Sequence, residues 1–301
     1  MGGDRDQLRW TPLGTLRKRK FMSKTLISFG HGYSARALAR LLGRQGWTFF
    51  GTTRKAEIGA ALEAEGVTPV LWPDGDLSDA LDQATHILMS AAPEAAGDPV
   101  LARFGPDISA IAARLEWAGY LSTTGVYGDH QGAWVDENAA LTPATKRGQM
   151  RVEAEAAWSA IPDLPLHIFR LAGIYGPGRG PFSKVRNGTA RRIIKPGQIF
   201  SRIHVDDIAQ VLAASIARPN PSTAYNVCDN DPAPPQDVIG YAAELLGVPL
   251  PPEVRFEDAE MSPMARSFYA ESKKVDNTRI RDELGVELIY PDYRTGLQAL
   301  L

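Results

Sequence analysis

The chain has 301 residues, enough for one large domain or two smaller ones. Its composition, 44% hydrophobic and 23% charged, is typical of a globular protein, and its net charge of -2 gives no reason to expect nucleic acid or a membrane surface as a partner. The one cysteine, Cys228, excludes an internal disulfide and a cysteine-based metal cluster, so we expect a cytoplasmic protein that acts without a metal.

Residues 1–22 differ from the rest of the chain. They contain a basic run over 17–20 and no continuous apolar stretch, so they do not indicate a signal peptide. We expect a disordered extension that adds nothing to the fold. The alternative is a basic tail that binds nucleic acid or membrane.

A glycine-rich turn follows the first strand pattern. Residues 25–29 form a short apolar run typical of a buried strand, and residues 30–35 then match G-x-G-x-x-A before a helical pattern. Gly30 permits the sharp turn, Gly32 leaves space for a pyrophosphate, and Ala35 lets the helix pack closely. Because a helix N-terminus offers free N–H groups, this context favours dinucleotide binding over an ordinary turn.

The end of the second strand indicates which dinucleotide binds. The strand pattern over 47–51 leads into Thr53, Arg54 and Lys55, and no acidic residue occurs before Glu57. An acid at this place would bind both ribose hydroxyls of NAD, whereas Arg54 suits the 2′-phosphate of NADP. We therefore expect NADP, with NAD bound more weakly; the alternative is that these cations only begin a solvated helix.

Strand and helix patterns alternate along the chain. Short apolar runs indicate strands over 67–71, 85–89, 120–122 and 166–171. Apolar residues at helical spacing indicate helices over 107–117 and 145–161. Repeated strand–helix units predict an α/β fold with a doubly wound parallel (Rossmann) sheet, whose ligands bind beyond the carboxyl ends of the strands. Ala91 and Ala92 follow the fourth strand and leave room for a cofactor.

Several motifs occur in a fixed order. Residues 121–129 read LSTTGVYGD, followed by VDE at 135–137, LTP at 141–143 and Arg147-x-x-x-Arg151. This order resembles the active-site half of the extended short-chain dehydrogenases/reductases, the NAD-dependent epimerase/dehydratase family. Further matching segments lie at 169–178, 201–209, 225–227 and 277–297, so the resemblance runs from Lys24 nearly to the end.

The resemblance implies roles for particular residues. In the family, a Ser or Thr polarises the substrate oxygen, a Tyr transfers its proton, and a Lys lowers the pKa of that Tyr and holds the ribose. Here Thr123 takes the Ser/Thr place, while Arg147 and Arg151 take the Tyr and Lys places. A register two residues earlier puts Thr145 and Gln149 there instead.

The usual proton-transfer pair is therefore missing in either register. No Tyr occurs between Tyr127 and Tyr175, and a guanidinium stays protonated at any working pH, so Arg147 cannot act as a general acid/base. We expect Thr123 and Tyr127 to supply the catalytic hydroxyls and Arg151 to bind the cofactor. The alternative for both arginines is a solvated helix face paired with Glu153 or Glu155.

Other polar residues are weaker candidates. Tyr175, like Tyr127, lies in a segment that approaches the nicotinamide and substrate in the family, although packing is the simpler explanation for both. Asp129 and His130 form a solvated turn or an acid/base pair. His204 and the acidic pair 206–207 are expected to cap a helix, because Asp favours that position.

The predicted domain organisation has two parts. Residues 23–176 plus 203–229 form the dinucleotide-binding domain, and 177–202 plus 230–301 form a smaller C-terminal substrate-binding region. The cofactor is expected to contact residues from six segments: Gly30, Gly32, Tyr33, Ala35, Thr53, Arg54, Ala91, Ala92, Thr123, Arg151, Ala172, Gly173 and Ile174.

The sequence supports two functional hypotheses. One is an NADP-dependent oxidoreductase or epimerase/dehydratase-like enzyme, a monomer or homodimer, acting on a small carbonyl, hydroxy or sugar-nucleotide-like substrate. The other is a catalytically silent NADP-binding sensor or interaction protein, which the missing Tyr–Lys pair favours. Fold alone does not decide between them.

Overall fold

The computed structural model describes residues 24–43 and 46–301. The expected extension over 1–22 lies outside the described residues. Within the described ranges, no helix combines the length and the apolar character needed to cross a membrane.

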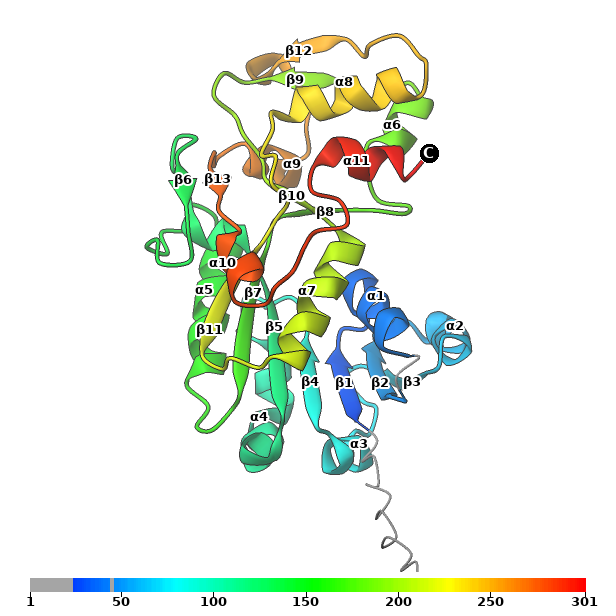
Figure 1. The fold of residues 1–301 in the computed structure, drawn as a ribbon, viewed down its shortest axis with the longest axis vertical. Coiled ribbons are helices and arrows are strands. Elements are labelled where there is room, and N and C mark those ends of the chain that lie inside the picture. Colours follow the sequence, from blue (N-terminus) through cyan, green and yellow to red (C-terminus); the bar gives the residue numbers. More distant parts are fainter. Residues whose placement is uncertain (1–23, 44–45) are drawn as a thin grey trace, which may run out of the picture.

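A seven-stranded parallel sheet forms the centre of the molecule (Figure 1). Its order is β11-β7-β5-β4-β1-β2-β3. The strands are β1 Thr25–Phe29, β2 Thr48–Thr53, β3 Val67–Leu71, β4 His86–Met89, β5 Trp117–Thr123, β7 Leu166–Leu171 and β11 Thr223–Val227. The order reverses between β1 and β4, which is where a doubly wound sheet leaves a crevice for ligands. The predicted Rossmann architecture is confirmed.

Helices cover both faces of the sheet, and each face has its own apolar core. One layer contains α1 Tyr33–Leu42, α2 Gly59–Ala64 and α7 Val205–Ala217. The other contains α3 Ser78–Gln83, α4 Pro99–Ile111 and α5 Lys146–Ser159. Because both faces are buried, the strands read as continuous apolar runs rather than alternating ones.

The helix predicted over 107–117 has the wrong bounds at both ends. α4 begins earlier, because the Asp98 carboxylate accepts hydrogen bonds from the N–H groups of Val100 and Leu101 and Pro99 occupies the first turn. Trp117 is instead the first residue of β5 and is fully buried. Apolar spacing alone did not separate the end of the helix from the strand that follows it.

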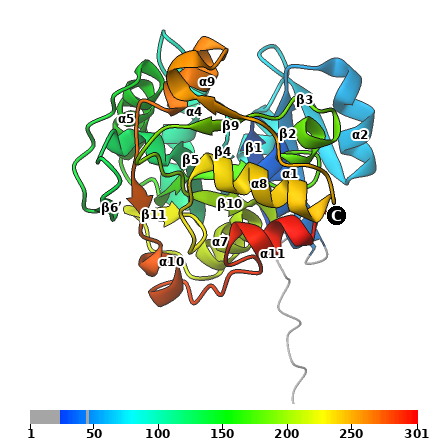
Figure 2. The same ribbon diagram turned by 90° about the horizontal axis from the view of Figure 1, so that it is seen from above.

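Most of the remaining elements gather at one end of the sheet, at the top of Figure 1, while α10 lies beside β11. They are three two-stranded pairs, β6 Trp134–Val135 with β13 Lys274–Val275, β8 Gly173–Tyr175 with β10 Arg202–His204, and β9 Arg192–Ile194 with β12 Glu253–Arg255. Five short helices accompany them: α6 Phe182–Arg186, α8 Pro235–Leu245, α9 Pro263–Phe268, α10 Thr278–Asp282 and α11 Tyr293–Gln298. Figure 2 shows α8 and α11 side by side over this end.

A third apolar cluster stabilises this end of the molecule. It joins α6, α8 and α11 through residues such as Phe182, Ala242 and Leu297. The cluster is separate from the two cores that flank the sheet. The division into a dinucleotide-binding domain and a substrate-binding region stays a prediction.

Candidate functional site

A cleft of about 1510 Å³ opens beyond the carboxyl ends of the sheet strands. The residues that follow β1, β2, β4, β5 and β7 line one side of it, and residues of the smaller region line the other. A site for one drug-sized ligand usually has about 300–1,000 Å³. This cleft therefore has room for a dinucleotide and a second small molecule.

The predicted phosphate turn lies at the switch point of the sheet. Gly30 has a φ of +81°, and a Cβ there would lie 2.9 Å from the backbone nitrogen of Ala91, so only glycine fits. At Gly32 a Cβ would approach only the Gly30 carbonyl oxygen, at 3.8 Å, and Gly32 caps the N-terminus of α1. Ala35 does not line the cleft but is buried in the core, which is the packing role expected of it.

His31, inside the same turn, was not singled out from the sequence. Its Nδ1 is hydrogen bonded to the Ser28 hydroxyl, and a side chain at Gly51 would collide with it, at 2.6 Å from the His31 Cβ. Burial lowers the pKa of His31 to about 4, so the ring is neutral at pH 7. The sequence pattern, in which His31 stands between two glycines, did not predict that its ring would be buried against β2.

Arg54 lines the cleft after β2, as expected of a residue that binds a 2′-phosphate. Its guanidinium forms an ion pair with Glu94 at 2.6 Å, and the two side chains are 65% and 54% exposed. Glu94 belongs to the loop after β4, so this contact spans the mouth of the cleft. An exposed pair of this kind is weak and can exchange for a contact with a phosphate.

Helix α5 brings both arginines of the missing pair into the cleft. Thr145 caps the helix by accepting a hydrogen bond from the Gly148 N–H. Arg147 and Arg151 line the cleft, as Thr145 does, whereas Gln149 does not. The four-residue spacing places both guanidinium-bearing side chains on the same face of the helix.

The two arginines have different surroundings. Arg151 donates to the Leu121 carbonyl at 2.7 Å and to the Tyr120 hydroxyl at 3.1 Å, so it is held against β5. Arg147 is exposed, and its guanidinium lies 5.5 Å from the ring centre of Phe268 on α9. Neither forms the expected alternative ion pair, since Glu155 is paired with Arg170.

Thr123, at the end of β5, also lines the cleft. Its Oγ1 accepts a hydrogen bond from the Gly125 N–H at 3.2 Å, which leaves the hydroxyl proton free to donate to a ligand. Ala91, Ala92, Ala172, Gly173 and Ile174 line the cleft as well, as do Tyr33 and Thr53. The structure thus brings the expected cofactor residues together, apart from the buried Ala35.

Tyr127 requires a correction, because the structure does not place it in the cleft. The residue is fully buried, and burial raises the pKa of its hydroxyl to about 12. The hydroxyl donates to the Asn226 Oδ1 at 2.7 Å and accepts from Arg170 at 2.9 Å. Because both contacts are internal, the geometry supports a structural role for Tyr127 and not a catalytic one.

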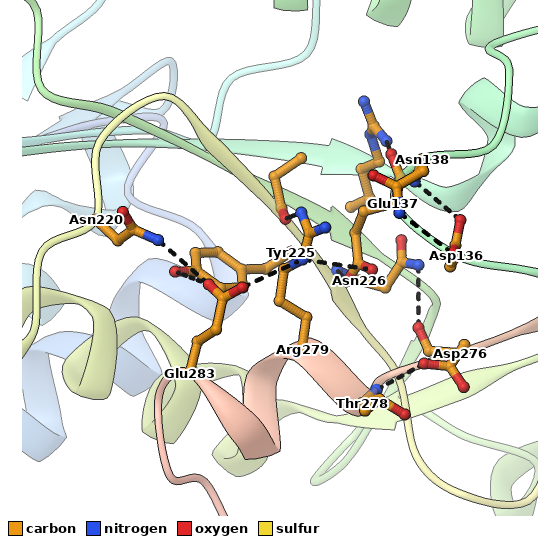
Figure 3. A network of polar contacts seen from close by, with 12 residues as sticks. Asp136, Glu137, Asn138, Asn220, Tyr225, Asn226, Asp276, Thr278, Arg279 and Glu283 are labelled. Carbon is orange, nitrogen blue, oxygen red and sulfur yellow. Dashed lines mark hydrogen bonds and ion pairs between the residues drawn. The ribbon is translucent and has the colours of Figure 1, made fainter.

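Asn226 connects Tyr127 to a wider polar network (Figure 3). The Asn226 backbone donates to the Glu137 carboxylate at 2.8 Å, and its side-chain amide donates to the Asp276 carbonyl at 3.0 Å. Arg279 on α10 lies 3.8 Å from the same Glu137 carboxylate. The network ties the loop after β6 and the α10 segment to the edge strand β11.

The weaker candidates also have internal partners. The Tyr175 hydroxyl lines the cleft wall but faces the Asp292 carbonyl at 3.4 Å, and Asp129 accepts from the backbone of Ser272. His204 caps α7 as expected, whereas the Asp207 carboxylate accepts from the backbone of Ile289 and Tyr290. Among residues 24–43 and 46–301, no group of three or more His, Cys, Asp or Glu side chains could hold a metal ion.

The cleft is strongly basic although the chain as a whole is slightly acidic. Nine of its lining residues are Lys or Arg and three are Glu: Arg54, Lys55, Arg147, Arg151, Arg179, Lys184, Arg191, Arg202 and Lys273 against Glu94, Glu260 and Glu271. A cleft lined by one sign of charge concentrates the field and attracts ligands of the opposite sign. Five of the nine cations come from residues after 178, and of these five only Arg202 lies in a segment that the motifs covered.

Comparison with known proteins extends over nearly the whole chain. Protein YeeZ of Escherichia coli K12 is 30% identical over 283 residues, which cover 89% of this chain and 97% of that protein. A conserved protein of unknown function from Silicibacter pomeroyi DSS is 63% identical, with a TM-score of 0.90 over 92% of this chain and 98% of that one. No protein-family model matches the chain.

A second solved structure carries a family name. It is a provisionally named NAD-dependent epimerase/dehydratase from Methylobacillus flagellatus, 28% identical, with a TM-score of 0.70 over 93% of this chain and 97% of that one. The sheet order, the turn after β1 and the cleft at the carboxyl ends of the strands agree with this likeness. The chain therefore has the extended short-chain dehydrogenase/reductase fold and is similar over nearly its whole length to this NAD-dependent epimerase/dehydratase.

Proposed function

We propose that the protein binds NADP(H) and catalyses hydride transfer to or from a small carbonyl, hydroxy or sugar-nucleotide-like substrate. The observation that carries this proposal is the basic cleft, in which the Gly30 turn, Arg54, Thr123 and the 172–174 segment meet. Gly30 and Gly32 leave space for a pyrophosphate at the N-terminus of α1, and Arg54 offers a cation for a 2′-phosphate. The NAD dependence in the name of the Methylobacillus protein agrees with a nucleotide cofactor.

Under this proposal, the residues in the cleft have the following roles. Bound NADPH would supply a hydride at the nicotinamide. The Thr123 hydroxyl donates a hydrogen bond to the substrate oxygen and thereby fixes the position of that oxygen. Arg147 lies on the face of α5 that lines the cleft, and its permanent charge stabilises negative charge that develops on the same oxygen.

This arrangement provides electrostatic help without an enzyme group that titrates near neutral pH. Arg147 and Arg151 keep their protons, and Tyr127 lies outside the cleft. The proton needed to complete an alcohol product would therefore come from water. General acid/base catalysis is worth about 10²–10⁴-fold, so we expect slow turnover on simple carbonyls.

A binding protein without turnover is the second candidate. The observation that favours it is the pair of arginines on α5, where the family has Tyr and Lys. Such a protein would bind NADPH with the same residues, because Arg54 and the Gly30 turn do not depend on the catalytic pair. The two candidates differ in one respect, which is whether NADPH is consumed.

Two measurements test the proposal. NADPH and NADH are titrated onto the purified protein, and NADPH fluorescence is then followed with a panel of aldehydes and ketones. We expect NADPH to bind more tightly than NADH and to be consumed slowly, with Thr123→Ala reducing the rate at least tenfold at unchanged NADPH affinity. Binding without consumption on any compound would favour the second candidate, and no binding of either nucleotide would exclude both.

A further inference from the structure

Arg202 is a cleft residue within the matching segment 201–209, and the resemblance gave it no role. It is the first residue of β10, which pairs with β8 so that Arg202 stands opposite Gly173. A Cβ at Gly173 would lie 3.7 Å from the Arg202 Cγ, so the side chain runs along the backbone of that segment. Arg202 therefore borders the 172–174 segment, which is expected to contact the cofactor.

The Arg202 guanidinium has backbone contacts but no ion-pair partner in the described part of the chain. One of its nitrogens donates to the Phe200 carbonyl at 2.9 Å and to the Ala233 carbonyl at 3.1 Å. By contrast, the buried Arg170 is paired with Glu155 at 2.9 Å. A charge removed from water and left unpaired is costly, so a half-buried arginine of this kind suits a ligand that brings the missing negative charge.

The neighbouring acidic residue Asp229 does not act as the counter-ion of Arg202. Asp229 donates its backbone N–H to the Arg202 carbonyl at 2.7 Å, while its carboxylate accepts a hydrogen bond from the backbone N–H of Asp231. Asp229 is 1% exposed, and burial raises the pKa of its carboxyl group to about 8. Burial thus favours the neutral form of this carboxyl group, against the opposing effect of the Arg202 charge.

The surroundings of Arg202 are aromatic. Tyr175, Tyr293, Phe200 and Tyr269 all line the cleft with it. The guanidinium lies 6.0 Å from the ring centre of Tyr293, and the rings of Phe200 and Tyr269 meet edge to face with their centres 5.5 Å apart. Such a wall accepts the body of an apolar or aromatic molecule beside a charged group.

The position of Arg202 separates it from the phosphate turn. The turn follows β1, while Arg202 borders the extension of β7, and these two strands are three positions apart in the sheet. At about 4.8 Å between neighbouring strands, the separation is about 14 Å. A negative group at Arg202 therefore belongs to the second molecule in the cleft and not to the pyrophosphate.

We propose that Arg202 is the anion-recognition residue of the substrate end of the cleft, and that the substrate carries a carboxylate or phosphate beside an apolar or aromatic body. The proposal rests on the proposed function only in taking the second molecule to be a substrate. The planar guanidinium offers two parallel N–H groups to a carboxylate or phosphate, which an ammonium group does not.

The first experiment compares matched ligands on the wild-type protein saturated with NADPH. Phenylacetate and phenyl phosphate are titrated by calorimetry beside phenylacetamide, which has the shape of the carboxylate without its charge. We expect one or both anions to bind at least tenfold more tightly than the amide, and the stronger of the two identifies the group. Equal binding of all three, or no binding of any, would overturn the proposal.

The second experiment removes the charge. Arg202→Gln should lower the affinity for the anion at least tenfold, to the level of the amide, with NADPH affinity unchanged within twofold, and Arg202→Lys should recover part of it. Arg255→Gln, at an exposed arginine outside the cleft, is the matched control and should change neither affinity. Anion binding that persists in Arg202→Gln, or a loss of NADPH affinity instead, would contradict the assignment.

A third measurement avoids variants that fail to fold. Phenylglyoxal modifies accessible arginines, and mass spectrometry locates the modified sites in the wild-type protein. The tighter-binding anion should protect Arg202 from modification, while phenylacetamide should not. Equal labelling of Arg202 with either ligand would overturn the proposal. Because NADPH binding is measured separately, its failure would defeat the proposed function without deciding the role of Arg202.

Discussion

At the scale of single residues, Glu94 competes with an incoming phosphate for Arg54. We expect Arg54→Ala to weaken NADPH binding about tenfold and to leave NADH binding unchanged, because a charge-assisted hydrogen bond contributes about 1.5–3 kcal/mol and exposure keeps this one at the low end. Glu94→Gln is the matched variant and should not weaken NADPH binding, since it only frees Arg54. Fluorescence titration of both nucleotides measures the effect, and an unchanged NADPH affinity in Arg54→Ala would exclude the role given to Arg54.

Tyr127 provides a second test at this scale. Its hydroxyl makes two buried hydrogen bonds, with Asn226 and Arg170, so Tyr127→Phe leaves those partners unsatisfied. We expect the free energy of unfolding in urea to fall by about 1–3 kcal/mol, with NADPH affinity unchanged. A variant of wild-type stability that has lost all turnover would instead restore the catalytic role expected from the sequence.

At the scale of elements, one buried ion pair fixes the helix that carries Arg147 and Arg151. Glu155 on α5 and Arg170 on β7 lie 2.9 Å apart with side chains 5% and 8% exposed, and the Ser122 hydroxyl donates to the same carboxylate. Truncating one partner leaves a buried charge without its counter-ion. The position of α5 along the cleft thus depends on a buried contact between the helix and strands β5 and β7.

We expect Arg170→Met to lower the free energy of unfolding by about 3–5 kcal/mol. The matched control is Arg36→Met, which removes the partly exposed pair between Arg36 and Glu65 and should cost less than about 1 kcal/mol. Urea denaturation of both variants gives the comparison. Equal losses in the two would show that burial does not distinguish these pairs.

At the scale of the whole molecule, buried carboxyl groups make global stability depend on pH. Burial raises the pKa of Asp229 from 3.8 to about 8 and that of Asp207 to about 6. Between pH 4 and these values, the folded protein holds protons that the unfolded chain has lost. The contribution of these two groups to the free energy of unfolding is therefore greatest below about pH 4. It is lost as pH rises through the folded pKa of each group.

Asp229→Asn should remove most of this loss. Each pH unit in the window costs at most about 1.4 kcal/mol per group, so the variant should be more stable than the wild type at pH 8 and nearly equal to it at pH 4. Urea unfolding at both pH values measures the difference. A variant that is less stable than the wild type at pH 8 would show that the Asp229 carboxylate is favourably ionised in the folded protein.

Much of the fold was predictable from local sequence. The strands at 25–29, 67–71 and 166–171 were predicted to the residue, because each is a short apolar run bounded by turn or polar residues. The Gly30 turn was predictable for the same local reason, since its conformation requires glycine. Thr123, Arg147 and Arg151 were found through motif order and spacing.

Tertiary structure decided what local pattern does not encode. Tyr127 follows a recognisable motif, yet its hydroxyl lies among Arg170 and Asn226, partners 43 and 99 residues away along the chain. Arg202 lies in a matching segment that gave it no role, and the other cations of the smaller region lie in segments without a motif. Only packing brings these cations to the cleft. The sequence alone therefore determined the sheet, the glycine turn after β1 and the absence of Tyr between Tyr127 and Tyr175, because backbone periodicity and residue type are local. The burial of Tyr127 and the basic substrate end were decided by long-range contacts.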